Sequence, residues 1–156
     1  NEADKKRAIE THLEGIITML PWIALIDKFQ HWIYTNPIHT NEERENKWLE
    51  LSKELSADVV DWSNYEDIRK ALWHKQLHIF EVPFYYIEYG IAQLGAIAVW
   101  RNYKQNKAKA IEDYKNALRI GYTKSIPEMY KTAGIEFNFS KEYVKELMDF
   151  LNSELA

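Results

Sequence analysis

His78 and three tyrosines, Tyr85, Tyr86 and Tyr89, are side chains whose types and spacing could do chemistry together. Tyr89 lies four residues after Tyr85 and three after Tyr86, so on a helix it shares a face with each of them. His78 precedes the break at Pro83 and could fold back over that face. Phenol hydroxyls and an imidazole N–H that converge in an apolar pocket can donate hydrogen bonds to an oxyanion. The alternative is that the tyrosines fill core space and bond to backbone or water.

His74 and His78 stand four residues apart, the spacing of the two histidines in the H-E-x-x-H motif of zinc peptidases. Lys75 occupies the position of the glutamate that serves there as general base, and a cation cannot accept a proton from water on the metal. We therefore expect no metal site from this pair, but one exposed histidine and one buried, hydrogen-bonded histidine. Asp27 and His31, also four residues apart, are expected to pair with each other.

Helices must position these residues, because apolar side chains recur at three and four residues almost throughout the chain. The first helix is predicted to end or kink at Pro21, which lacks an N–H and clashes with the preceding turn. The stretch from Phe84 to Trp100, broken by Glu88 and Gln93, is apolar nearly all round, which is typical of a buried helix. No segment alternates as a strand would. The predicted fold class is all-α, a helical bundle of about seven to eight helices.

Charge and composition exclude several classes of function. The 156 residues include 20 Lys and Arg against 24 Asp and Glu, a net charge of −4, so no broad basic surface is available for nucleic acid. There is no cysteine, which excludes disulfides and thiolate zinc sites and fits a reducing compartment. No run reaches the roughly 18 continuous apolar residues of a membrane-spanning helix. We expect a cytoplasmic protein with neither nucleic acid nor a membrane as partner.

The segment from His78 to Tyr89, HIFEVPFYYIEY, resembles a stretch of the oligoendopeptidase F branch of the thimet oligopeptidase family of zinc metallopeptidases. That family shows a histidine, a short loop, then P-F-Y and a further tyrosine that opens a long helix. Flanking segments agree with the family in the same order: LPW at 20–22, DKFQHWIY at 27–34, ALRIG at 117–121 and AGI at 133–135. The resemblance extends over nearly the whole chain.

The resemblance implies part of a larger all-α, bowl-shaped peptidase, in which zinc is held by H-E-x-x-H and a glutamate on the following helix. Neither element is found in the sequence, which begins Asn1-Glu2-Ala3. We therefore expect residues 1–156 to be the C-terminal part of a zinc oligopeptidase catalytic domain, without the metal-binding helices and inactive alone. Zinc is a cofactor of the complete enzyme, and none is expected to bind this chain by itself.

The resemblance also assigns roles to residues by position. His78 and Tyr89 would be catalytic, as donors to the developing oxyanion, and Tyr85 and Tyr86 would be substrate-binding. Expected partners are short peptide substrates and the N-terminal part of the peptidase. An apolar surface near the tyrosines is expected to stay open, to be covered by that part or by a second copy in a homo-oligomer. The alternative function is a non-catalytic all-α protein-interaction module, with the tyrosines as core.

Overall fold

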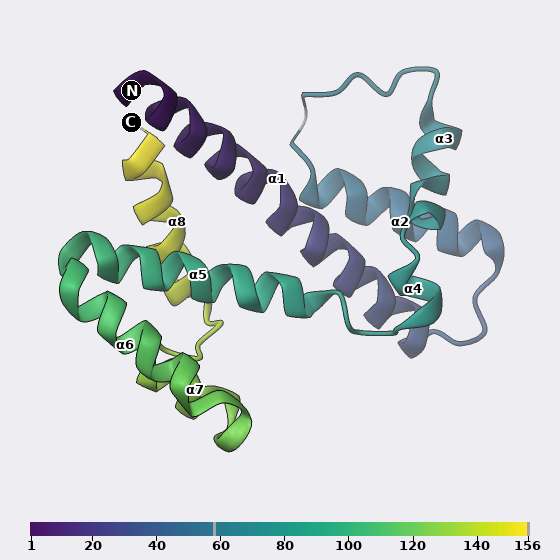
Figure 1. The fold of residues 1–156 in the computed structure, drawn as a ribbon. Coiled ribbons are helices and arrows are strands. Elements are labelled where there is room, and N and C mark those ends of the chain that lie inside the picture. Colours follow the sequence, from purple (N-terminus) through teal and green to yellow (C-terminus); the bar gives the residue numbers. More distant parts are fainter. Residues whose placement is uncertain (58, 156) are drawn as a thin grey trace. The chain divides into compact units, whose positions relative to one another are not determined.

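The computed structural model describes residues 1–57 and 59–155, and within them the chain is helical without any strand (Figure 1). Eight α-helices and two 3-10 helices (η1 and η2) follow one another in this part of the chain, which confirms the all-α prediction. Their bounds are α1 Glu2–Thr35, α2 Asn41–Leu55, α3 Glu66–Ala71, η1 Leu72–Lys75, α4 His78–Glu81, α5 Ile87–Gln105, α6 Lys107–Ile120, η2 Gly121–Thr123, α7 Ile126–Thr132 and α8 Lys141–Leu155.

The chain forms two compact units, and α1 and α5 each contribute to both. Unit 1 comprises Asn1–Leu13 and Ile91–Ala156, and unit 2 comprises Glu14–Gly90. His78 and the three tyrosines all belong to unit 2, so the candidate site is built within a single unit.

Unit 2 has an aromatic-rich core in which α1, α2, η1 and α4 meet. The ring of Phe29 lies 5.0 Å from that of Trp48 and 5.6 Å from that of Trp73, measured between centroids. Trp48 is fully buried, and its indole N–H donates to the carbonyl of Arg69 at 3.0 Å. The packing therefore fixes the segment that leads into α4. The buried core residues are Leu25, Ile26, Phe29, Trp48, Leu51, Trp73 and Ile79.

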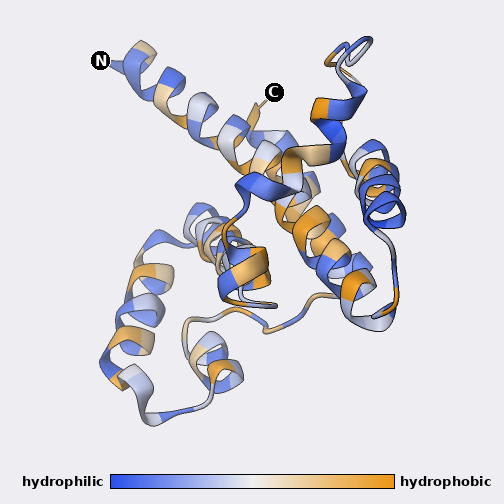
Figure 2. Cartoon of the chain, turned by 90° about the vertical axis from the view of Figure 1, so that its right-hand side faces the viewer, coloured by the Kyte–Doolittle hydropathy of each residue, from blue (hydrophilic) through white to orange (hydrophobic). Residues whose placement is uncertain are grey.

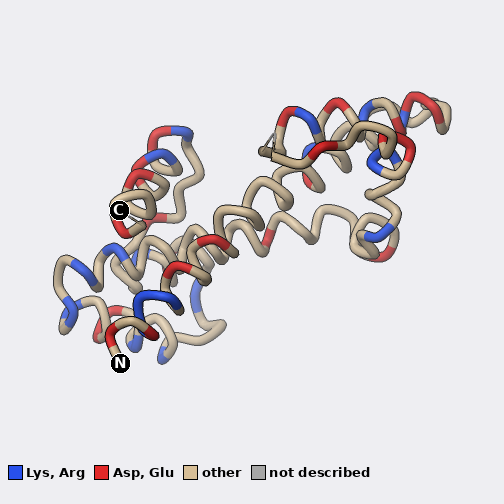
Figure 3. Tube along the Cα trace, turned by 90° about the horizontal axis from the view of Figure 1, so that it is seen from above, with Lys and Arg blue, Asp and Glu red and all other residues tan. Residues whose placement is uncertain are grey.

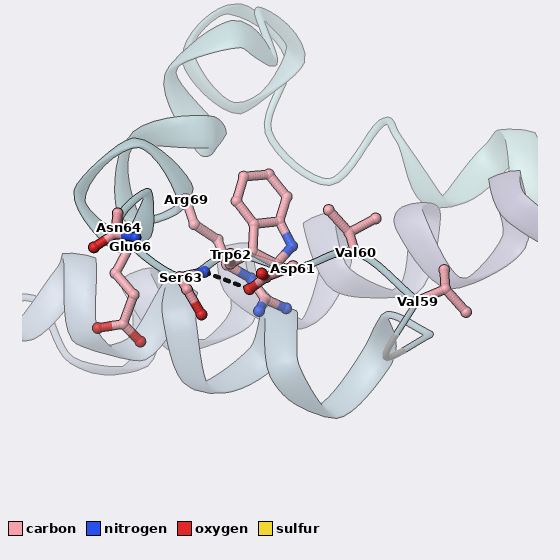
Figure 4. A pocket seen from close by; sticks show the side chains of 8 residues that line it. All are labelled: Val59, Val60, Asp61, Trp62, Ser63, Asn64, Glu66 and Arg69. Atoms are coloured by element: carbon pink, nitrogen blue, oxygen red, sulfur yellow. Dashed lines mark hydrogen bonds between the residues drawn. The ribbon is translucent and has the colours of Figure 1, made fainter.

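Arg69 of α3 ties its own segment to α2. Its Nε–H donates to Ser52 Oγ at 3.0 Å, and Nη2 donates to the Ser52 carbonyl at 3.1 Å and to Ser56 Oγ at 2.8 Å. The Trp62 ring lies 5.4 Å from the guanidinium carbon, within reach of a cation–π contact. Arg69 and Trp62 line a hollow of about 590 Å³ together with the loop before α3. Figure 4 shows the side chains that line it. Because most of its hydrogen bonds run to α2, Arg69 serves to hold this loop in place.

Helix α1 continues through Pro21, so the first helix does not end there, which was one of the two outcomes predicted for this proline. A proline inside a helix removes one backbone hydrogen bond and costs about 3 kcal/mol. Ile16 before the proline, and Ile23 and Ile26 after it, are all buried. Burying one such side chain contributes about 1.5–3 kcal/mol, so packing on both sides of Pro21 offsets the loss.

Charged residues cluster in the first turns of α1 and are absent between Glu14 and Asp27. Figures 2 and 3 show the middle of this helix as largely apolar and uncharged. By length and composition alone α1 is apolar enough to cross a membrane: an 18-residue window has a mean hydropathy of 1.3, with 28% of it buried. A core helix of a water-soluble protein meets the same criterion. Here α1 supplies Leu25, Ile26 and Phe29 to the core of unit 2, and packing accounts for these residues.

Unit 1 packs the second part of α5 with α6, α7 and α8. Tyr130 of α7 donates its hydroxyl to the carbonyl of Ile91 at 3.1 Å, and its ring lies over Gly95, where any Cβ would clash with it. Asn102 Nδ2 donates to the carbonyl of Gly134 at 2.7 Å. Gly134 has φ +74°, a left-handed conformation that favours glycine, and it ends the segment after α7.

Candidate active site

A short turn between α4 and α5 brings the four candidate residues together. His78 begins α4, Tyr85 and Tyr86 precede α5, and Tyr89 lies in the first turn of α5. The His78 ring centroid lies 4.9 Å from that of Tyr86, 5.7 Å from that of Tyr89 and 6.2 Å from that of Tyr85. Tyr89 also meets Tyr85 at 5.7 Å and Tyr86 at 5.2 Å, edge to face. The structure thus places all four rings in one cluster, which we call the His–Tyr cluster.

Phe84 holds the turn that forms the cluster. It follows Pro83 and has φ +60°, a left-handed conformation that costs a non-glycine residue about 1–2 kcal/mol. Its ring lies 4.9 Å from that of His31 and 5.1 Å from that of Tyr34, both on α1. Asp27 Oδ2 in turn lies 3.5 Å from His31 Nε2, so the predicted pair of Asp27 and His31 is present beneath this turn. These contacts offset the strain of the turn.

A series of hydrogen bonds fixes which ring nitrogen of neutral His78 carries the proton. The indole N–H of Trp22 donates to Gln76 Oε1 at 3.2 Å, and an indole can only donate. The amide of Gln76 is therefore oriented with Nε2–H toward His78 Nδ1, 2.7 Å away. Since Nδ1 accepts this bond, the proton of the neutral imidazole lies on Nε2.

Tyr89 accepts the last hydrogen bond of this series. His78 Nε2 lies 3.3 Å from Tyr89 Oη, and because Nε2 carries the proton it donates to the phenol oxygen. The hydroxyl hydrogen of Tyr89 is then free to donate to a third group. An acceptor that is itself polarised by a hydrogen bond becomes a stronger donor. The arrangement therefore presents one polarised O–H at the surface of unit 2.

The side chains of the His–Tyr cluster are more exposed to solvent than those of an enclosed apolar pocket would be. Tyr85 is 44% exposed and Tyr89 is 42% exposed, whereas Tyr86 and His78 are partly buried. The stretch from residue 84, which is apolar nearly all round, is therefore open at its start in this chain. The side chains of Phe80 and Val82 nearby are exposed as well, so an apolar surface is open beside the tyrosines, as expected.

Burial raises the pKa of Tyr86 above its ordinary value, and the neighbouring Tyr89 adds to this rise, while a contact with Trp22 acts in the opposite direction. The phenol of Tyr86 therefore keeps its proton at neutral pH. It can act as a hydrogen-bond donor without introducing charge into the cluster.

His74 does not join the cluster. It belongs to η1, while His78 begins α4, so the two histidines do not share the face of one helix. The His74 side chain is exposed, and its ring lies 4.0 Å from that of Trp73. Across residues 1–57 and 59–155, no group of three or more His, Cys, Asp or Glu side chains could hold a metal ion. The residues that the structure describes therefore do not fit a zinc site.

The sequence did not reveal Trp22 and Gln76 as parts of the site. Trp22 precedes Gln76 by 54 residues, and their contact depends on how α1 packs against the segment between η1 and α4. The available signal was a glutamine two residues before the candidate histidine. A spacing of two residues does not predict a side-chain contact on a helix, and here a turn separates η1 from α4.

Similar proteins give the same picture of the fold. Residues 1–149 match peptidase family M3. A provisionally assigned oligoendopeptidase F, whose X-ray structure was solved at 3.1 Å, is 30% identical with a TM-score of 0.80, over 99% of this chain and 27% of that chain. PZ peptidase A, solved with an inhibitor, is 28% identical with a TM-score of 0.77, over 99% of this chain and 29% of that chain. No curated protein matches.

These matches confirm the resemblance to oligoendopeptidase F, and they show that the chain spans less than a third of the length of each of the two solved structures. The family match extends over residues 1–149 of 156, and the fold agrees along 99% of the chain. The chain is a member of peptidase family M3.

Proposed function

We propose that this chain forms a substrate-facing part of an M3 oligopeptidase that hydrolyses peptide bonds in short peptides. In this proposal Tyr89 is the catalytic donor to the substrate, and Tyr85 and Tyr86 contact the peptide. The single observation that carries the proposal is the contact of 3.3 Å between His78 Nε2 and Tyr89 Oη, from which we infer that the hydroxyl hydrogen of Tyr89 is available to a substrate.

The chemistry follows from charge. When a nucleophile adds to a peptide carbonyl, negative charge develops on the carbonyl oxygen, and a preoriented donor stabilises the transition state more than the substrate. Tyr89 donates its O–H to that oxygen. His78 acts through Tyr89, because its Nε2–H polarises the phenol, and it is therefore a positioning residue in this geometry.

Zinc remains a cofactor of the proposed complete enzyme. Since no set of described residues fits a metal site, its ligands would have to come from polypeptide outside the described residues, and no step of the proposal on this chain runs through the metal. The exposed apolar side chains of Phe80 and Val82 suit contact with such polypeptide. In this proposal the chain is inactive alone.

The test replaces Tyr89 by Phe in the complete peptidase. The loss of one preoriented donor should lower kcat by about 10²–10³, with the zinc content unchanged. Tyr65→Phe is the matched control, because Tyr65 is an exposed tyrosine of unit 2 outside the His–Tyr cluster, and it should leave kcat unchanged. A Tyr89→Phe enzyme with the original kcat would remove Tyr89 from the mechanism.

A further inference from the structure

An apolar groove of about 550 Å³ lies in unit 1, between α5 and α6. None of its lining residues belongs to the His–Tyr cluster. Residues three and four positions apart on each helix form its two walls, which is the spacing of side chains on one helical face. The apolar side chains that matter most are Val99, Trp100 and Tyr103 on α5 and Ile111, Tyr114 and Leu118 on α6.

Helix α6 leaves its large apolar side chains open and buries small ones. Its buried residues are Ala110 and Ala117. Leu118 is 62% exposed, Tyr114 is 48% exposed and Ile111 is 37% exposed. An amphipathic helix normally turns its apolar face toward a packing partner, so this exposed stripe is typical of a face that packs against a further element. Together with the α5 wall it forms one contiguous apolar patch, the kind of surface that marks an interaction site.

The free charges beside the groove are positive. Lys115 lines the groove, and Lys107 Nζ lies 5.6 Å from the centre of the Tyr103 ring. Neither lysine has a carboxylate within 4 Å in the described part of the chain, and no Asp or Glu is among the residues that line the groove. A partner with carboxylates beside its apolar side chains is therefore complementary to the groove, and a partner with cations there is repelled.

The same charges disfavour a second copy of this chain as the partner. In a two-fold symmetric dimer each patch meets itself, so Lys107 and Lys115 of one copy would lie near the same two lysines of the other. The solved relatives offer another source of partner. This chain covers 27% and 29% of them, so more than two thirds of each consists of polypeptide outside the matched part.

We propose that the groove between α5 and α6 holds an amphipathic helix from the part of the peptidase that lies outside this chain. The helix presents apolar side chains at positions i, i+3 or i+4, and i+7, with an Asp or Glu on the side that meets Lys115. Lying along the groove, it contacts both walls at once and covers Ile111, Tyr114 and Leu118. This inference rests on the proposed function, because it takes the chain as part of a complete M3 oligopeptidase.

A thiol at position 118 reports whether the groove is occupied, because the chain has no cysteine of its own. Leu118→Cys is made in this chain and in the complete peptidase, and mass spectrometry measures the alkylation rate at that position. The rate should be at least about tenfold lower in the complete peptidase, since the thiol is accessible only when the helix leaves the groove. Glu112→Cys is the matched control, because Glu112 is exposed on α6 and does not line the groove, and its rate should be the same in both proteins.

Two results of this experiment would overturn the proposal. Equal alkylation rates at position 118 in the two proteins would show that the groove stays open in the complete peptidase. Protection of that position in this chain alone, increasing with protein concentration, would show that a second copy fills the groove.

Photochemical cross-linking identifies the partner segment. Benzoylphenylalanine in place of Tyr114 of the complete peptidase should cross-link to residues three and four apart in one segment outside residues 1–156, with an Asp or Glu among them. Cross-links to an irregular segment, to a second copy or within residues 1–156 would contradict the helix. The kcat of Tyr89→Phe is a separate readout. Lowered kcat with an open groove excludes the helix alone, and a protected groove with unchanged kcat removes Tyr89 alone.

Discussion

Gln76 Nε2 lies 2.7 Å from His78 Nδ1, and this contact decides which nitrogen of His78 carries the proton. Trp22 sets the orientation of the amide, because its indole N–H requires the oxygen of Gln76 as acceptor. The consequence reaches Tyr89, whose hydroxyl hydrogen is left free for a substrate. An amide that touches no substrate thus governs the direction of donation at the proposed active site.

Gln76→Glu should reverse this arrangement. A carboxylate can only accept a hydrogen bond, so Nδ1 of His78 must carry a proton in this variant. Long-range ¹H–¹⁵N NMR of the imidazoles shows which ring nitrogen carries the proton. The unmodified chain should show His78 in the Nε2–H form, with that hydrogen directed at Tyr89 Oη.

His74 is the internal control for that measurement, since it is exposed and makes no hydrogen bond with the described residues. Its signals should be the same in the two proteins. An Nδ1–H form of His78 in the unmodified chain would contradict the assigned direction of the hydrogen bonds.

How far the sequence predicts the site depends on distance along the chain. The proximity of His78 to Tyr89 was predictable, because eleven positions and one proline turn separate them. The contact between Trp22 and Gln76 was not, because it joins segments that are brought together by the core around Trp48 and Trp73. Local periodicity contains no information about such a contact.

Local rules fail at two places in the chain. Pro21 was expected to end or kink a helix, but the helix continues, because burial of Ile16 and Ile23 on either side outweighs one lost hydrogen bond. The spacing of His74 and His78 would place both on one face of a helix, but the chain changes from η1 to α4 between them. In each case tertiary packing overrides a rule that depends on neighbouring residues alone. The all-α class was predictable, since the periodicity holds over most of the chain.

Glu43 provides a test of pH dependence. It lies in the first turn of α2 and accepts from the Thr40 N–H at 2.7 Å and from the Thr40 hydroxyl at 2.9 Å, and these bonds hold its pKa below the ordinary value of 4.5. Because the folded-state pKa is lowered, the stabilisation is present above about pH 4.5 and is lost as the pH falls through the folded-state pKa. Glu43→Gln should therefore lower the melting temperature at pH 7, and this difference should shrink as the pH falls below 4.5 and through the folded-state pKa.

The control for that series is Glu42→Gln. Glu42 lies in the same first turn and makes no side-chain hydrogen bond with the described residues, so its variant should not show a comparable pH dependence. Equal pH profiles of the two variants, measured by thermal unfolding, would show that the Thr40 bonds do not contribute.

Two glycines give opposite expectations for the same substitution. Gly134→Ala should lower the free energy of unfolding by about 1–2 kcal/mol, because φ +74° is unfavourable for alanine. Gly15→Ala lies inside α1 with no atom within 4 Å of the new Cβ, and it should raise the free energy of unfolding by about 0.5–1 kcal/mol. Urea unfolding of the two variants measures both values. Shifts of the same sign would contradict the backbone conformation of one of the two positions.

A double-mutant cycle of His78→Ala and Tyr89→Phe, measured as kcat/KM of the complete peptidase, tests most directly whether the histidine acts through the tyrosine. Each single change should lower kcat/KM, and the double variant should be no slower than Tyr89→Phe alone, because His78 has no further route to the substrate once the hydroxyl is gone. If His78→Ala lowers kcat/KM by the same factor with and without Tyr89→Phe, the two residues act independently and the account is wrong.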